Sequence, residues 1–152
     1  MRISAKADYA VRAMAELAAA PAGQPVKAEA LAASQDIPRN FLDNILSELR
    51  SSGLVRTLRG PDGGSMLARP AKEITVAEVL RAVEGPLAAV RGTRPESLEY
   101  PGAATRLPEV WIAVRANLRG VLERVTLADL AAGKLPADIA RLAKNPEAWL
   151  PH

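Results

Sequence analysis

The chain has 152 residues, of which 49% are hydrophobic and 3% aromatic, and its formal net charge is +3. It has no cysteine and its single histidine is the last residue, which excludes disulfides, cysteine-ligated iron–sulfur clusters and histidine metal clusters. Charged residues interrupt any signal-peptide core, and no apolar run approaches the roughly 20 residues of a membrane span. We therefore expect a mainly helical cytoplasmic protein with no cofactor, no metal and no membrane partner.

The first third of the chain contains two predicted helices. Ser4 can cap a first helix that runs to about Ala20. Prolines and a glycine within residues 21–25 end it, and a short second helix follows over residues 26–35. Residues 35–38 then form a tight turn into a third helix, and these proportions are typical of a helix-turn-helix. The apolar stripe of the first helix comprises Tyr9, Ala10, Ala13, Met14 and Leu17.

Residues 37–69 combine an amphipathic helix with a glycine-rich hairpin. Within residues 38–52 the apolar positions recur at the three-to-four spacing of a helix. Residues 54–58 change to a strand period, and residues 65–68 can return as the partner strand. Such a hairpin beside a helix-turn-helix predicts a winged helix-turn-helix. The apolar positions of the helix are Phe41, Leu42, Ile45, Leu46 and Leu49.

The polar face of this third helix carries groups that pair with base edges. Its residues lie three to four apart and point the same way, and they are Arg39, Asn40, Asp43, Asn44 and Ser47. Guanidinium, amide, carboxylate and hydroxyl groups form hydrogen bonds in a DNA major groove. A merely solvated face is the alternative, but the neighbouring short helix and hairpin favour DNA binding. Asp43 would accept from a cytosine amine or orient a neighbouring side chain.

The hairpin turn is basic and rich in glycine. Residues 50–72 hold five basic side chains and one acidic one, a local charge of +4. The turn lacks the Gly-Lys-Ser/Thr ending of a phosphate loop and does not open a helix, so a nucleotide site is not expected. Arg59 is placed to enter a minor groove or to bind a phosphate. The glycines of the turn are Gly60, Gly63 and Gly64. The expected phosphate contacts are Lys6, Arg39 and Arg50, and a solvated charge is the alternative at each.

The remainder of the chain is predicted to hold further helices around an irregular segment. Thr75 and Glu78 form a capping box that begins a fourth helix, and Thr126 and Asp129 repeat that signature. Residues 87–107 form a loop whose length is typical of functional or disordered segments. A long helix then carries an apolar seam with coiled-coil period, which predicts a dimer interface; packing on the protein's own core is the alternative. The seam comprises Leu107, Trp111, Val114, Leu118, Val121 and Val125.

These elements suggest three parts. Residues 1–70 would form the DNA-binding domain, residues 71–135 the dimerisation helices with an effector-type loop at 87–107, and residues 136–152 a tail. Tyr100 and Trp111 would supply apolar walls for an effector at the loop, and a plain linker is the alternative. The chain has no internal histidine, no cysteine and no Gly-x-Ser-x-Gly elbow, so we do not expect an enzyme.

Several segments resemble the Rrf2 family of winged helix-turn-helix transcriptional regulators. Residues 1–14 resemble the family's N-terminus, and residues 37–55 its recognition helix and exit. Residues 59–64, Arg-Gly-Pro-Asp-Gly-Gly, resemble its wing and are the most specific match. The segments that begin at Ile74 and Thr126 complete a resemblance that covers nearly the whole chain.

The resemblance implies a homodimeric repressor or activator, with base contacts around Asn40 and Asp43 and wing insertion by Arg59. Iron–sulfur members carry three cysteines between the fourth helix and the long helix, and this chain has none. Ser65 also stands where an aromatic residue is common. The resemblance therefore supports DNA binding but not the inherited sensor.

We predict a sequence-specific, DNA-binding transcriptional regulator that acts as a homodimer on a palindrome-like operator. Repression is the expected action, with activation as the alternative, and the effector would be an unknown small molecule or protein. A competing interpretation is a protein-interaction module in which the helix-turn-helix is a relic. Salt-dependent binding to double-stranded DNA would separate the two interpretations.

Overall fold

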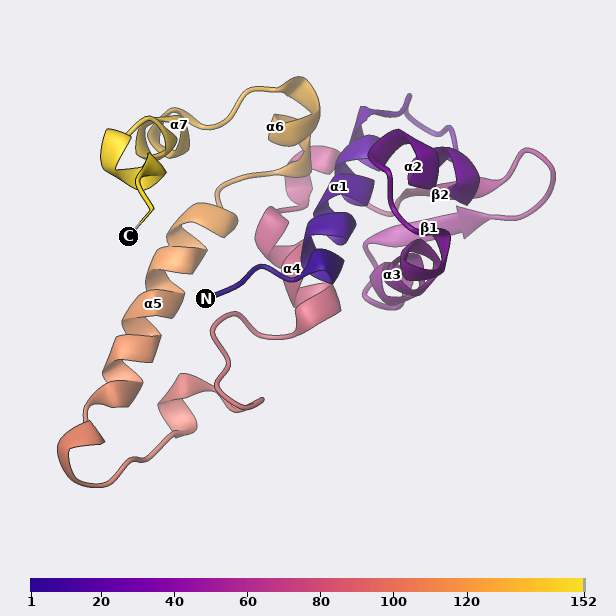
Figure 1. The fold of residues 1–152 in the computed structure, drawn as a ribbon. Helices are drawn as coiled ribbons and strands as arrows, with labels where there is room; N and C mark the ends of the chain where they lie inside the picture. The colour runs from indigo at the N-terminus through magenta and orange to yellow at the C-terminus, as the bar shows by residue number, and fades with distance from the viewer. Residues whose placement is uncertain (152) are drawn as a thin grey trace.

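A computed structural model describes residues 1–151 and shows a mainly α protein with a two-stranded antiparallel wing (Figure 1). This confirms the predicted fold class. In chain order the elements are α1 (Ala5–Ala19), α2 (Ala28–Gln35), α3 (Arg39–Ser51), β1 (Val55–Leu58), β2 (Gly64–Leu67), α4 (Val76–Glu84), α5 (Leu107–Leu122), α6 (Leu127–Ala132) and α7 (Ala137–Ala143).

Helix α1 is the centre of the core. Ala10, Ala13 and Met14 are completely buried, as the predicted stripe requires. The helices α2, α3, α4 and α6 all pack against α1 or against one another. Their small and aliphatic side chains form one continuous apolar cluster, which is the main stabilising contribution to the fold. Its members outside α1 include Leu31, Ile37, Leu42, Ile45, Leu49, Leu54, Ile74, Val79, Val83 and Leu127.

The helix starts are set by side-chain caps. Ser4 Oγ accepts from the Ala7 amide at 3.0 Å and begins α1. Capping boxes at the starts of α4 and α6 confirm both predicted signatures, because Thr75 with Glu78 and Thr126 with Asp129 satisfy reciprocal amides. The two boxes lie side by side, since Thr75 and Thr126 form an antiparallel bridge. This bridge joins the start of α6 to the start of α4, and both helices pack against α1.

The wing, formed by β1 and β2, is joined to the helical core by the segment that precedes α2. Strands β1 and β2 pair from Val55 opposite Leu67 to Leu58 opposite Gly64. Val26 and Ser65 exchange two backbone hydrogen bonds of 2.8 Å, so Val26 extends this small sheet. The prediction that the second helix starts at residue 26 was therefore wrong, and α2 begins at Ala28.

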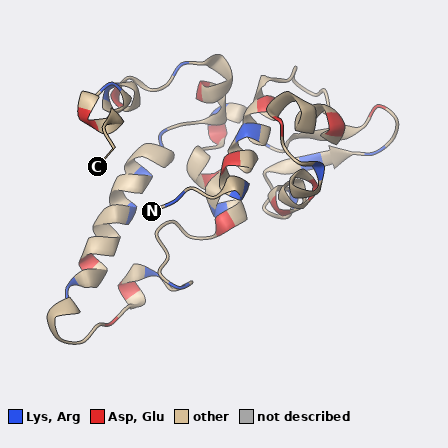
Figure 2. Cartoon of the chain, viewed as in Figure 1, with Lys and Arg blue, Asp and Glu red and all other residues tan. Residues whose placement is uncertain are grey.

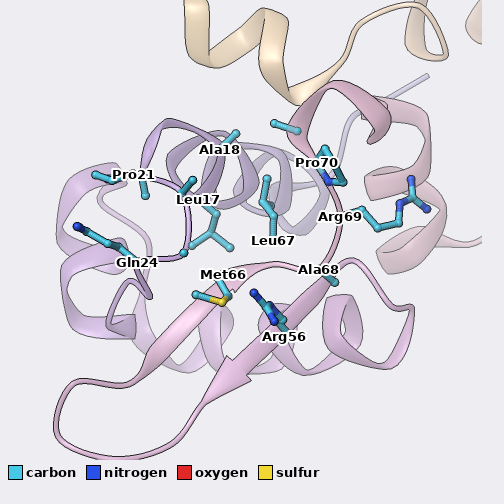
Figure 3. A pocket seen from close by; sticks show the side chains of 14 residues that line it. Leu17, Ala18, Pro21, Gln24, Arg56, Met66, Leu67, Ala68, Arg69 and Pro70 are labelled. Carbon is cyan, nitrogen blue, oxygen red and sulfur yellow. The ribbon is translucent and has the colours of Figure 1, made fainter.

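A cavity of about 390 Å³ lies between the end of α1, the following loop and the wing (Figure 3). Leu17 from α1 and Leu67 from β2 lie together at its centre, and Arg56 and Arg69 lie nearer its edge. Leu17 belongs to the core cluster and Leu67 packs against that cluster. The base of the wing is therefore anchored on the apolar end of α1.

Phe41 departs from the predicted apolar face of the third helix. Its side chain is 49% exposed, whereas Leu42, Ile45 and Leu49 of the same helix are buried. The Phe41 ring meets Tyr9 of α1 edge-on, with ring centroids 6.1 Å apart. Because Phe41 lies at the border of the apolar stripe, its ring covers the contact between α1 and α3 without entering the core.

Helix α5 stands apart from the helices of the core and from the wing (Figure 1), and none of its residues is buried. The preceding residues 87–107, predicted as a loop, include 3₁₀ turns at Pro95–Ser97 and Gly102–Ala104, and the first turn packs against α5. Val125 does not belong to the predicted seam, because α5 ends at Leu122 and Val125 is buried beyond it. Its carbonyl accepts from the Val76 amide at 2.9 Å. In residues 1–151, no helix has the length and hydropathy needed to cross a membrane.

Candidate nucleic-acid interface

The exposed face of α3 is fixed by the burial of its opposite face. Leu42, Ile45, Leu46 and Leu49 point into the core, which leaves the polar residues on the surface. All of the residues predicted to contact DNA from this helix are exposed: Arg39, Asn40, Asp43, Asn44, Ser47 and Arg50. The amphipathic pattern therefore places them on one continuous face, as predicted.

Arg39 is held at the start of this face by two carboxylates. Its Nη1 lies 2.6 Å from Glu29 Oε1 on α2, and its Nε lies 3.0 Å from Asp43 Oδ1 one turn along α3. The hydrogen bond from Arg39 lowers the pKa of Glu29, and hydrogen bonds to Glu29 and Asp43 raise the pKa of Arg39. These two ion pairs orient the Arg39 side chain across the turn between α2 and α3.

Lys6 lies at the edge of the same face. Its Nζ is 2.8 Å from Glu48 Oε2, so it links the start of α1 to α3. A surface hollow of about 400 Å³ brings Lys6 together with Asn44 and Ser47. Both α3 and its border with α1 thus present polar groups around one concave surface.

Arg50 connects α3 to the wing. Its Nη1 donates to Thr57 Oγ1 of β1 at 3.1 Å. Figure 2 shows acidic and basic residues mixed along α3, and a single acidic stretch in the loop that joins the two strands. The remaining charged residues of the hairpin are basic. The Arg50–Thr57 contact therefore links the basic hairpin to the exposed helix.

The tip of the wing is shaped by its glycines. Gly60 has φ +105°, and its carbonyl accepts from the Gly63 amide at 3.0 Å. A Cβ at Gly63 would lie 2.1 Å from the Leu58 carbonyl oxygen, and one at Gly64 would lie 2.4 Å from the Val26 carbonyl oxygen. The turn is therefore a close-packed arrangement that only glycine allows. It leaves Arg59 exposed at the tip.

Among the residues of this surface that were not predicted from the sequence are Glu29 and Thr57. Glu29 holds Arg39 from another helix, and Thr57 accepts from Arg50 across the exit of α3. Both are exposed polar residues in segments with no motif of their own. Such pairings depend on how α2, α3 and β1 fold together, so the local sequence pattern contains no signal for them.

Helix α5 presents a second candidate surface, suited to protein contact. A shallow apolar groove of about 540 Å³ runs along it and includes Val114, Leu118 and Val121 of the predicted seam. Leu107 and Trp111 are partly buried and do not line this groove. The groove instead extends to Val110, Ala113, Asn117 and Leu122.

Comparison with known proteins identifies the family. Residues 3–133 match the Rrf2 family model, which is described as an iron-dependent transcriptional regulator. The chain is 54% identical over 145 residues to Rv1287 of Mycobacterium tuberculosis strain H37Rv, whose name describes an HTH-type transcriptional regulator; the match covers 95% of this chain and 90% of that protein. It is 35% identical to CymR of Bacillus subtilis, over 87% of this chain and 91% of CymR.

Solved structures give the same result. The structure of CymR of B. subtilis, described as the global cysteine regulator, has a TM-score of 0.73 at 34% identity and covers 88% of this chain and 98% of that one. The structure of IscR from T. potens has a TM-score of 0.67 at 30% identity, with coverages of 100% and 93%. The winged helix of these regulators is therefore also the fold of this chain.

The iron dependence in the family description does not fit this donor set. The chain has no cysteine to supply thiolates for an iron–sulfur cluster. Within residues 1–151, no three His, Cys, Asp or Glu side chains lie together in a group able to hold a metal ion. The winged-helix fold of the family, by contrast, is present. The chain belongs to the Rrf2 family of HTH-type transcriptional regulators, which are DNA-binding proteins and not enzymes.

Proposed function

We propose that this protein represses transcription as a homodimer bound to a palindrome-like operator. The observation that carries this proposal is the exposed polar face of α3 beside a wing whose turn is fixed by glycines. One such unit contacts only a short stretch of DNA. Two units related by a two-fold axis would place their recognition helices in successive major grooves, about 34 Å apart.

On α3 we assign base contacts to the residues with short polar side chains and phosphate contacts to the long basic ones. The proposed base contacts are Asn40, Asp43, Asn44 and Ser47, with Asp43 accepting from a cytosine amine or orienting Arg39. The proposed phosphate contacts are Lys6, Arg39 and Arg50. Arg59 would enter the minor groove, supported by the tight turn of Gly60, Gly63 and Gly64.

We assign the dimer interface to α5. A sixteen-residue helix that buries none of its own residues, yet carries an apolar groove, is typical of a helix that packs against a partner. Two copies of α5 can cover each other's Val114, Leu118 and Val121 through a self-complementary contact. Leu107 and Trp111 would contribute from the start of the helix, while Val125 is excluded by its burial in the body.

Repression requires no protein surface other than the one that binds DNA. A dimer that occupies two successive major grooves excludes other proteins from the same DNA, so binding alone can block transcription. The division into a DNA-binding part over residues 1–70, a dimerisation part over residues 71–135 and a tail follows from this assignment. The expected location is the cytoplasm, together with the DNA.

Selection from a random pool of duplexes with the purified protein tests this proposal. We expect enriched sequences to contain two inverted half-sites whose centres lie about one helical turn apart. Enrichment of a single half-site would contradict the dimeric arrangement. Failure to enrich any sequence would contradict sequence-specific binding altogether.

A further inference from the structure

A cavity lined by arginines lies where α4, α5 and the loop between them meet. Its volume is about 600 Å³, within the range of small-molecule sites. Tyr100 and Trp111, predicted as apolar walls of an effector site in this loop, do not line it. Its lining comprises Arg81, Gly85, Pro86, Leu87, Arg94, Glu96, Arg115, Arg119 and Glu123. We call this site the arginine cavity.

The arginine cavity has an excess of positive charge. Its walls carry four guanidinium groups and two carboxylates. Glu123 accepts from Arg81 of α4 and, at 3.0 Å, from Arg119 of α5. Glu96 Oε2 lies 2.7 Å from Arg115 Nη1. Within residues 1–151 no ion pair engages Arg94, which lines the cavity from the loop. Two formal positive charges therefore remain uncompensated around one hollow.

A structural role in joining α4 to α5 does not explain why four arginines line this cavity. The bridge from Arg81 through Glu123 to Arg119 already joins the two helices. Arg94 and Arg115 add two further guanidinium groups but only one further carboxylate, Glu96, so like charges gather around this hollow. Figure 2 shows basic residues on α5 and on the loop beneath α4. A bound anion would offset this surplus of guanidinium groups.

We propose that the arginine cavity binds a small organic dianion. Guanidinium groups form paired hydrogen bonds with carboxylates and phosphates alike, because both present two acceptor oxygens in matching geometry. A charge of −2 would neutralise the surplus, and Leu87 and Pro86 offer apolar contact to a short carbon skeleton. The ligand class is a phosphate monoester or a dicarboxylate of metabolite size.

The location of the cavity connects it to DNA binding, a step that rests on the proposed function. Helix α4 packs against α1 and α3, whereas α5 carries the proposed dimer interface. A dianion that draws Arg81 of α4 and Arg115 of α5 together would fix the angle between these helices. In a dimer, that angle sets the distance between the two recognition helices and thereby the affinity for the operator.

Thermal unfolding without DNA tests the site itself. The probes are glycerol 3-phosphate, succinate and, as a monoanion control, acetate, all at equal ionic strength. We expect at least one dianion to raise Tm saturably beyond the acetate effect, and the more effective one identifies the ligand class. Arg94→Gln should weaken the apparent affinity about tenfold, the effect of losing one charge-assisted contact. The matched control Arg91→Gln alters an exposed arginine of the same loop that does not line the cavity, and it should respond like the unmodified chain.

Two results would overturn the site: no dianion exceeds acetate, or Arg94→Gln and the unmodified chain respond alike. Operator affinity is then measured with and without the effective dianion. An unchanged affinity would overturn the regulatory role while leaving the site intact. If the protein binds no DNA under either condition, the proposed function fails, but the unfolding data still decide whether the dianion binds.

Discussion

Arg39 and Asp43 are joined by a 3.0 Å hydrogen bond between Nε and Oδ1, one turn apart on the exposed face of α3. Glu29 completes the arrangement from α2, 2.6 Å from Arg39 Nη1. Asp43 therefore orients an arginine and is at the same time exposed on the helix face proposed to contact bases. Two negative charges beside the proposed phosphate contacts would reduce affinity for any duplex, so their presence favours a role in specificity.

Substitution of Asp43 by alanine should relax sequence preference. The change removes one carboxylate that repels the phosphates of any sequence, and it removes the acceptor proposed for a base edge. Affinity for a selected operator should therefore fall relative to affinity for a scrambled duplex, as measured by fluorescence anisotropy. Asp43→Asn, which keeps the acceptor oxygen, should lose less preference. An equal loss of affinity on both duplexes with Asp43→Ala would show that the residue does not act in specificity.

Gly64→Ala should destabilise the wing. Gly64 has φ +156°, and a Cβ there would lie 2.4 Å from the Val26 carbonyl oxygen, so the hydrogen bonds between Val26 and Ser65 would be disturbed. We expect a loss of about 1–3 kcal/mol in the free energy of unfolding, measured by urea denaturation, together with weaker operator binding.

Gly120→Ala is the matched control for this substitution. Gly120 lies inside α5, and a Cβ added there would meet nothing within 4 Å. The same chemical change should therefore stabilise the protein by about 0.5–1 kcal/mol, since alanine favours helix. A neutral effect of Gly64→Ala would contradict the close approach of the wing to Val26.

Leu118→Asp should convert the proposed dimer to monomers. The substitution places an unpaired charge in the α5 groove, where burial against a partner is very unfavourable. Sedimentation equilibrium should show the monomer mass, and circular dichroism should retain the helical signal. Ile112→Asp is the control, because Ile112 is 37% exposed on α5 and does not line the groove. If Leu118→Asp remains dimeric, the interface lies on another surface.

The sequence predicted local features better than contacts between distant segments. Thr75 and Thr126 were identified as helix caps because a capping box is complete within four residues. The exposed face of α3 and the glycine turn were found for the same reason. Val125 was assigned to the seam because the apolar period continues past the end of α5. The local pattern could not show that the helix ends before Val125 and that Val125 is buried in the core. The pairing of Glu29 with Arg39 joins two helices and has no local pattern.

The bridge between α4 and α5 should depend on pH. Hydrogen bonds from Arg81 and then Arg119 lower the pKa of Glu123. Its contribution to stability is therefore fully present above the ordinary pKa of a glutamate, and it disappears as the pH falls through the lowered pKa of the folded state. Thermal unfolding at neutral pH should show a lower Tm for Glu123→Gln than for the unmodified chain, and this difference should vanish on acidification.

Glu99→Gln controls for a general effect of losing one carboxylate. Glu99 is exposed, and no ion pair engages it within residues 1–151. Its substitution should leave Tm nearly unchanged at neutral pH. A difference for Glu123→Gln that persists at acid pH would show that this side chain acts through packing and not through its charge.

The most direct test of the central claim is the salt dependence of binding to a selected operator. Fluorescence anisotropy should show an affinity that falls linearly with salt on logarithmic axes, because phosphate contacts release counterions. Arg59→Ala should weaken operator binding by roughly 1–3 kcal/mol if Arg59 enters the minor groove, and should reduce the slope by about one if it binds a phosphate. A scrambled duplex should bind more weakly at every salt concentration. Equal affinity for operator and scrambled duplex, or an affinity that does not change with salt, would contradict sequence-specific DNA binding by this protein.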